Sequence, residues 1–236
     1  MLFRSGVSGI TPALRRQLSD LLEVTVQDFV AGHKYDVIVS SGLTSKSSAV
    51  QNAGDTTGLE AQPAKPSSAP GVGKPEPGEA TLTTQPGTLA AGILEAVTAG
   101  TPLLAMPQTD VLSEGVARQL ADAGAFTYNG TVGDFRAPWM GNWYFVRKHP
   151  VYEGMPVDQA MGFHYQAKGR QSNGLLVDGP NVEIIAAYSR DHDRNIGAGT
   201  FTTKLGPAKV LYQRVPELHP VLQQRFLANA LRWLMS

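Results

Sequence analysis

The sequence contains no cysteine in its 236 residues. This absence excludes disulfide bonds, thiolate metal sites and cysteine nucleophiles. It does not indicate a compartment, because cytosolic and exported proteins can both lack cysteine. Catalysis by a cysteine thiolate is therefore excluded before any fold is considered.

An excess of one charge is also absent. Lysine and arginine together number 20, and aspartate and glutamate together also number 20. A nucleic-acid-binding protein normally carries a basic excess or a basic stripe, so we expect neither a nucleic-acid partner nor an anionic membrane surface. No apolar run approaches the roughly 18 to 20 residues of a membrane helix, and residues 1–6 lack the apolar stretch of a signal peptide. We expect a soluble protein, cytoplasmic or exported.

Hydrophobic residues make up 42% of the chain and charged residues 17%, which is enough for one large domain with a substantial core. Residues 43–85 differ, because serine, threonine, alanine, glycine and proline dominate them. Such a stretch cannot bury enough apolar surface to offset the entropy of ordering it. We therefore predict a single α/β domain over residues 1–236 that contains a flexible low-complexity insertion at 43–85.

Strand and helix patterns alternate around this insertion. Thr11 followed by Pro12 is typical of a helix start. Residues 35–41 form a short β-branched run, which suits a strand buried on both faces of a parallel sheet. The patterns predict strands at 2–6, 23–29, 35–41 and 101–106, and helices at 12–22, 89–99 and 113–123, the last with Val116, Leu120 and Ala123 facing inward. This order predicts a flavodoxin-like, mostly parallel sheet with helices on both faces.

The second half of the chain is richer in aromatic residues and less regular. We predict strands at 175–177 and 182–188, and a hairpin formed by 199–203 and 208–213 around the turn at 204–207. Residues 219–235 carry an apolar face at helical spacing, which predicts a helix docked on the domain. The fold should therefore include an antiparallel extension in its C-terminal half.

Six phrases in this order carry a family resemblance: YDVIV at 35–39, AGTPLLA at 99–105, PWMGNW at 138–143, HPVYEGMP at 149–156, GPAKVL at 206–211 and RFLANALRWL at 225–234. The chain resembles the class I glutamine amidotransferase-like superfamily. Within it, the chain is most similar to trehalose-utilisation-like proteins and to the domains associated with β-galactosidases and family 2 glycoside hydrolases. The resemblance spans nearly the whole chain apart from the insertion, and it implies the same flavodoxin-like fold.

The resemblance also implies a position for the nucleophile. Working amidotransferases carry a cysteine on the tight turn after a central strand, with a histidine from a later strand as its base. That position falls near Pro107 here, in a turn at 107–110 that offers no thiol. Ser113 is the nearest hydroxyl but lacks the setting of a nucleophile elbow, and His219 lies outside the family's catalytic phrase. We expect no glutaminase activity, no cofactor and no metal site.

If the chain is nevertheless an enzyme, four side chains are candidates for acid–base chemistry. Asp110 and Glu114 could form a carboxylate pair of the kind that hydrolyses glycosides, and His149 could act with them. His192 is flanked by two aspartates, but on a strand it would point away from both of them. We favour a solvated turn for residues 191–193 and a purely structural turn around His149.

Four other side chains are candidates for binding. Ser41 follows the strand at 35–41, and Gln108 follows the strand at 101–106, so both should lie at the carboxyl edge where doubly wound sheets bind ligands. Trp139 and Trp143 belong to an aromatic cluster that could fill a core, form a subunit interface or stack against a sugar ring.

The leading hypothesis is a non-catalytic module of a larger carbohydrate-active enzyme. Its partners would be neighbouring domains of a longer chain or other copies in a homo-oligomer, and possible ligands include a saccharide. Two alternatives remain, a free-standing sugar-processing hydrolase and a carbohydrate-binding domain.

Overall fold

The computed structural model describes residues 3–21, 24–42, 87–131, 143–157, 159–161, 174–189, 197–214 and 220–236. They lie in one compact unit, which comprises residues 1–44 and 86–236. The insertion predicted at 43–85 lies outside the described residues. Within the described ranges, no helix has the length and apolar character needed to cross a membrane.

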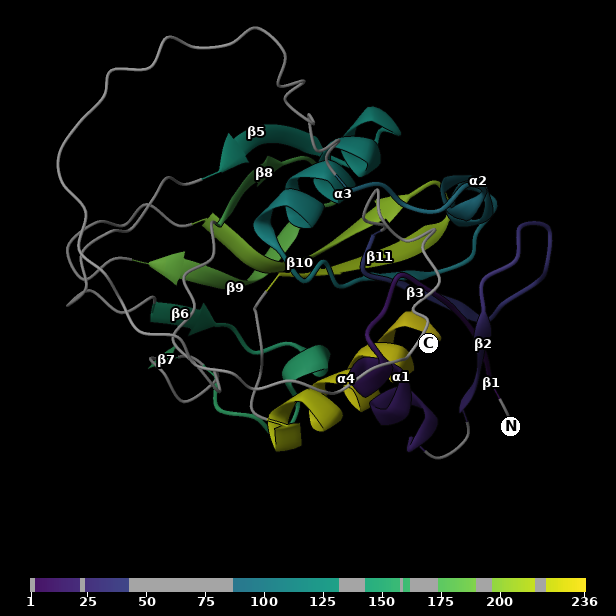
Figure 1. Cartoon of the computed structure of the whole chain (residues 1–236). Coiled ribbons are helices and arrows are strands. Elements are labelled where there is room, and N and C mark those ends of the chain that lie inside the picture. Colours follow the sequence, from purple (N-terminus) through teal and green to yellow (C-terminus); the bar gives the residue numbers. More distant parts are fainter. Residues whose placement is uncertain are drawn as a thin grey trace, which may run out of the picture. The chain divides into compact units, whose positions relative to one another are not determined.

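Five parallel strands form one half of the sheet, in the order β2-β1-β3-β4-β11 (Figure 1). Their bounds are β1 Phe3–Ser8, β2 Val24–Asp28, β3 Val37–Ser40, β4 Leu103–Ala105 and β11 Ala208–Gln213. The order reverses at β1, because the chain passes first to β2 on one side and then to β3 on the other. This is the doubly wound, flavodoxin-like order, and it confirms the predicted fold class.

Helices cover both faces of the parallel strands. Helix α1 (Pro12–Ser19) and helix α4 (Pro220–Leu234) pack on one face, and α2 (Ile93–Thr98) and α3 (Asp110–Asp122) pack on the other. The three apolar residues of β3 contribute to both cores: Val37 and Val39 join the α1–α4 core, whereas Ile38 joins the α2–α3 core. Both faces of the strand are buried, so a continuous apolar run is required.

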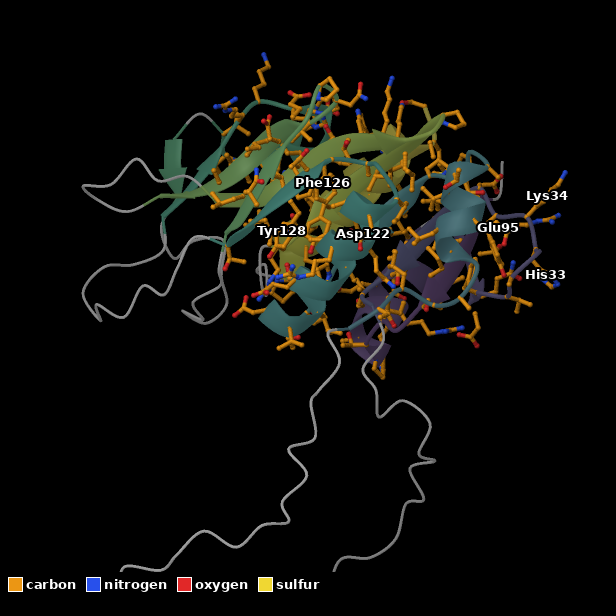
Figure 2. The ribbon with its side chains drawn as sticks, turned by 90° about the horizontal axis from the view of Figure 1, so that it is seen from above. His33, Lys34, Glu95, Asp122, Phe126 and Tyr128 are labelled. Atoms are coloured by element: carbon orange, nitrogen blue, oxygen red, sulfur yellow. The ribbon has the colours of Figure 1, made fainter. Side chains whose placement is uncertain are left out.

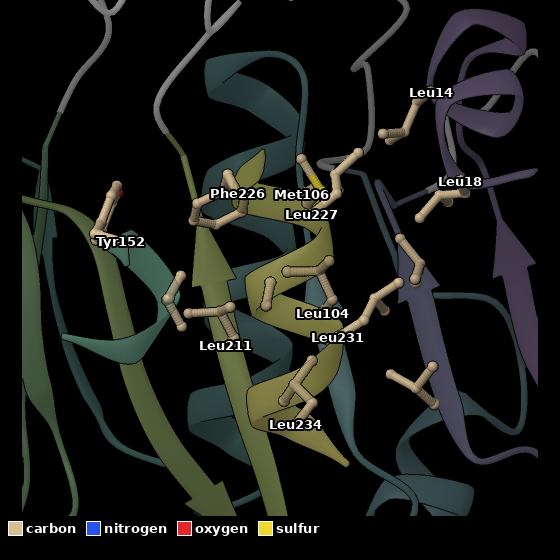
Figure 3. Packing of buried hydrophobic residues seen from close by; sticks show 14 of the residues in the cluster. Leu14, Leu18, Leu104, Met106, Tyr152, Leu211, Phe226, Leu227, Leu231 and Leu234 are labelled. Carbon is tan, nitrogen blue, oxygen red and sulfur yellow. The ribbon is translucent and has the colours of Figure 1, made fainter. Parts of the chain in front are cut away.

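Local sequence explains where α1 and α4 form. The Thr11 hydroxyl accepts a hydrogen bond from the Leu14 backbone N–H at 3.2 Å, which caps α1 as predicted. The apolar face predicted for the last helix is also confirmed, and Figure 3 shows its side chains against Leu104 and Leu211 of the sheet. Burial of one such large apolar side chain contributes about 1.5–3 kcal/mol. The buried apolar side chains of α4 are Phe226, Leu227, Ala230, Leu231 and Leu234.

The other half of the 11-stranded sheet is antiparallel. Strand β10 (Gly197–Leu205) pairs with β11 through the predicted hairpin, whose turn contains Gly206 at φ +59°. The sheet continues through β9 (Glu183–Ser189) and β6 (Trp143–Val146) to β7 (Gln159–Met161). Strand β8 (Leu175–Asp178) pairs with β10 and with β5 (Thr127–Thr131). Strands β5, β6 and β7 were not predicted from the sequence.

Two helix boundaries differ from those predicted. Helix α2 begins at Ile93 and not at Leu89, because Gly92 has φ +84°, which a right-handed helix does not accommodate. Helix α3 begins three residues earlier than predicted, at Asp110, because the Thr109 hydroxyl accepts from the Leu112 backbone N–H. The prediction that Ala123 faces inward is wrong: it is the exposed C-terminal cap of α3.

Candidate functional site

The carboxyl ends of three neighbouring parallel strands align at one edge of the sheet. Ser40 pairs with Ala105, and Ala105 pairs with Tyr212. The residues that follow these three along their strands are Ser41, Met106 and Gln213, and they therefore lie side by side at this edge of the sheet. Doubly wound sheets bind ligands at this edge, so this is the candidate site that the fold provides.

The turn between β4 and α3 contains Pro107, the residue that the sequence resemblance led us to expect at the nucleophile position. Pro107 is buried. Gln108, predicted to bind ligand, is exposed, and its side-chain nitrogen donates to the Met106 carbonyl oxygen at 2.7 Å. The described turn therefore holds a buried pyrrolidine ring and an amide that stabilises the turn itself.

Asp110, a candidate catalytic acid, forms an ion pair at the same edge. Its carboxylate lies 2.5 Å from the guanidinium of Arg214, the residue that follows β11. The Arg214 side chain is 3% exposed and the Asp110 side chain is 41% exposed. The pair connects the first turn of α3 to the end of β11, and the carboxylate also lies near the favourable N-terminus of the helix.

Glu114, the second candidate carboxylate, lies one helical turn further along α3 and pairs with Arg118 at 3.8 Å. The same guanidinium lies 5.1 Å from the centroid of the Tyr128 ring, and Figure 2 shows Tyr128 beside α3. Burial raises the pKa of Tyr128, the Glu114 carboxylate adds to that rise, and Arg118 opposes it. Asp110 and Glu114 are thus each matched with a different cation.

His149 performs a structural task. Its Nδ1 atom accepts a hydrogen bond from the Val151 backbone N–H at 3.2 Å, at the start of the short 3-10 helix η1 (Pro150–Tyr152). Its ring meets Trp233 of α4 edge-on, with 5.3 Å between ring centroids. Burial lowers the pKa of His149, and the Glu183 carboxylate opposes that shift. These contacts agree with the structural turn favoured from the sequence.

A buried polar chain that the sequence analysis missed reaches the candidate edge. The Tyr152 hydroxyl lies 2.9 Å from the Thr200 hydroxyl, which donates in turn to the side-chain oxygen of Gln213. Gln213 ends a strand that was predicted correctly, at 208–213. The rule that identified Ser41, a polar residue at the carboxyl end of a parallel strand, would therefore have identified Gln213 as well.

The Ser41 hydroxyl and the side-chain nitrogen of Gln213 are buried at this edge and have no hydrogen-bond partner in the described structure. Ser41 is 0% exposed and Gln213 is 2% exposed. Buried polar groups are normally paired, so each exception requires an explanation.

Several predicted residues cannot be placed at any site. Trp139, His192 and His219 lie outside the described residues, and Trp143 is described only through its backbone, in β6.

Three hollows lined by described residues lie away from the carboxyl edge of the parallel strands. They measure about 640 Å³ between α4 and the amino ends of β1 and β2, about 880 Å³ at the amino ends of β3 and β4, and about 620 Å³ beside η1.

Comparison with known proteins does not assign this chain to a family. No family model matches the chain, and no curated protein matches it significantly. Solved structures that match the chain include the following three. A putative ThuA-like protein from Parabacteroides merdae is 14% identical with a TM-score of 0.48, covering 100% of this chain and 91% of the other. A cytoplasmic protein from Salmonella typhimurium is 14% identical with a TM-score of 0.49, covering 94% and 86%.

The third is a β-galactosidase from Rahnella, 8% identical with a TM-score of 0.49. The alignment covers 99% of this chain and 31% of the β-galactosidase. At such low identities and TM-scores, these likenesses do not assign a family. The flavodoxin-like fold follows from the strand order and the pairing of the chain itself.

Proposed function

We propose that this chain is a non-catalytic module with an amidotransferase-like fold, which packs against neighbouring domains or other copies within a larger carbohydrate-active enzyme. The observation that carries this proposal is the turn after β4. A buried proline stands there, at the position where working amidotransferases present a reactive cysteine.

The roles of the remaining candidate groups support the non-catalytic part of the proposal. A general acid or base must reach a proton of the substrate. Asp110 instead pairs with Arg214, Glu114 pairs with Arg118, and His149 caps η1. Each of these side chains has a structural task that accounts for its presence.

The carbohydrate part of the proposal rests on two of the phrases that resemble glycosidase-associated domains, 149–156 and 225–234. These two segments contact each other. The Asn229 side chain donates to the Glu153 carbonyl oxygen at 2.9 Å, and Arg225 donates to the Gly154 carbonyl oxygen. Gly154 has φ +68°, so the turn that receives both bonds favours glycine. The two phrases thus form one structural unit that attaches α4 to the domain.

Activity assays on the purified chain test whether it is catalytic. We expect no ammonia release from glutamine and no hydrolysis of nitrophenyl glycosides above the blank. Asp110→Asn and Glu114→Gln are the matched controls, since each removes one candidate acid at similar side-chain size. Turnover that either substitution abolishes would overturn the non-catalytic assignment.

The natural reading frame tests the module hypothesis separately. We expect it to continue from these residues into a glycoside hydrolase. A frame confined to residues 1–236 would contradict the module assignment, and the activity assays would then stand alone.

A further inference from the structure

Strand β2 ends the parallel half of the sheet, and its outer edge pairs with no strand among the described residues (Figure 1). The Phe29 backbone N–H donates to the Val7 carbonyl oxygen of β1, so the odd-numbered residues of β2 direct their backbone groups toward β1. The N–H and C=O groups of Val24 and Val26 therefore point outward. In the part of the chain that the structure describes, no backbone group bonds to them.

This edge carries none of the features that usually keep an edge strand from pairing. Such strands are often blunted by lysine, proline or a β-bulge. Strand β2 reads Val-Thr-Val-Gln-Asp and follows β1 in an unbroken register. Its one charged residue, Asp28, is held by Arg15 of α1 at 2.6 Å. The backbone groups of the edge are thus open to a further strand.

The two ends of β2 are complementary to each other. The loop after its carboxyl end carries Val30, which is 48% exposed, and Lys34, which Figure 2 shows projecting outward. The amino end borders the hollow of about 640 Å³, where Leu21 and Val24 contribute apolar surface and Asp20 a carboxylate. Neither Asp20 nor Lys34 forms an ion pair with another described residue. One end offers an apolar side chain and a cation, and the other offers an apolar hollow and an anion.

We infer that β2 is the contact edge of a symmetric homodimer, in which two copies of this chain pair antiparallel and form one continuous sheet. Antiparallel pairing sets the carboxyl end of each β2 beside the amino end of the other, so the complementary ends meet twice. Main-chain bonds hold such a pair together, and the flanking side chains determine which strand is accepted. The inference rests on the proposed function in choosing another copy as the partner.

The register follows from the outward groups. With the twofold axis at Val26, this residue exchanges both backbone bonds with Val26 of the second copy, and Val24 lies opposite Asp28 of the second copy. The two Asp28 carboxylates then lie apart, so no like charges face each other across the pair. Val30 of each copy covers the hollow of the other, and Lys34 pairs with Asp20 of the other copy.

Sedimentation velocity on the purified chain over a range of concentrations measures the Kd of the dimer. Val30→Asp should raise this Kd at least about tenfold, because it brings a carboxylate to the hollow and to Asp20 at two symmetry-related places. Val111→Asp is the matched control. Val111 is 51% exposed and lies on α3, on the α2–α3 face of the sheet, so its substitution should leave the Kd unchanged.

A charge swap tests the pairing of the two ends directly. Lys34→Asp and Asp20→Lys should each raise the Kd about tenfold, because each sets like charges together twice. The double variant should return the Kd to within about threefold of the wild type. In hydrogen exchange, the Val26 amide should be protected more strongly as the dimer forms, whereas the Gln27 amide, which already bonds β1, should not change.

A wild-type chain that stays monomeric overturns the inference, and so does a dimer whose Kd is the same in Val30→Asp and in the single charge variants. Either result leaves the activity assays and the reading frame, which test the proposed function, unaffected. Conversely, catalytic turnover would overturn the proposed function without changing the Kd of the dimer.

Discussion

The central parallel strands β3 and β4 bury their residues differently from β8 in the antiparallel half of the sheet. In the parallel half, all four residues of β3 and all three residues of β4 are buried, because helices cover both faces. In the antiparallel half, β8 alternates in exposure, and its Leu176 is 39% exposed. Strand β11 belongs to both halves, since it is parallel to β4 and antiparallel to β10. Helices thus bury the central parallel strands β3 and β4 on both faces, whereas β8 keeps residues exposed and depends on its pairing with β5 and β10.

The largest effect should follow from weakening a helix contact in the parallel half. Phe226 of α4 is 0% exposed and packs against Tyr152, with 5.6 Å between ring centroids. Phe226→Ala should lower the free energy of unfolding by about 3–5 kcal/mol, because it leaves a cavity in the core. Urea unfolding measures this change.

Val221→Ala, on the same helix, is the control for this prediction. Val221 is 63% exposed, so its truncation should change stability by no more than about 0.5 kcal/mol. Equal effects of the two substitutions would contradict the role assigned to α4.

The next effect tests close strand contact in the antiparallel half. A Cβ atom added to Gly174 would lie 2.6 Å from the Gly197 Cα atom, so backbone would meet backbone. Gly174→Ala should lower the free energy of unfolding by about 1–3 kcal/mol in urea unfolding, because neither backbone segment can move away without breaking strand pairs.

Gly124→Ala is the control. Gly124 has φ +89° but no atom within 4 Å of an added Cβ, so the substitution should cost only the left-handed backbone strain of about 1 kcal/mol. A smaller loss at Gly174 than at Gly124 would show that the halves do not differ in this way.

A smaller effect should come from the buried polar chain that links the halves. Tyr152→Phe removes a hydroxyl that bonds Thr200, at a cost of about 1 kcal/mol. A double-mutant cycle with Thr200→Val isolates that bond from the other contacts of Tyr152. The double variant should lose less stability than the sum of the two single variants. Additive losses would mean that the two hydroxyls are not coupled.

The contrast between buried and partly exposed strands also explains which strands could be predicted from the sequence. Within the run at 35–41, the consecutive apolar residues 37–39 suit a strand covered on both faces, so this pattern alone identified a strand of a parallel sheet. Strand β5 reads Thr-Tyr-Asn-Gly-Thr, and its residues are exposed or half-buried. Such a strand depends on its pairing with β8, far away in sequence, and no local pattern predicts that pairing.

For the candidate site, too, the sequence predicts some features and not others. The positions of Ser41, Gln108 and Pro107 at the sheet edge follow from strand ends, which the sequence indicates. The ion pair of Asp110 with Arg214 joins residues 104 positions apart, and the contact of Tyr152 with Thr200 joins residues 48 positions apart. These partners become neighbours only through the sheet order, so the sequence could name the acids but not what neutralises them.

The smallest effect concerns the pH dependence of stability that His149 contributes where η1 packs on α4. Burial holds the pKa of His149 below its ordinary value of about 6.5 in the folded protein. The unfolded chain therefore binds the proton first as pH falls, so stability is complete above about 6.5 and is lost as pH drops from there toward the lowered pKa. His149→Phe keeps a ring against Trp233 and should remove this part of the pH dependence, as urea unfolding at pH values from about 5 to 8 would show. An unchanged slope in the variant would assign the loss to other groups, and the packing of η1 on α4 would then be independent of the charge on His149.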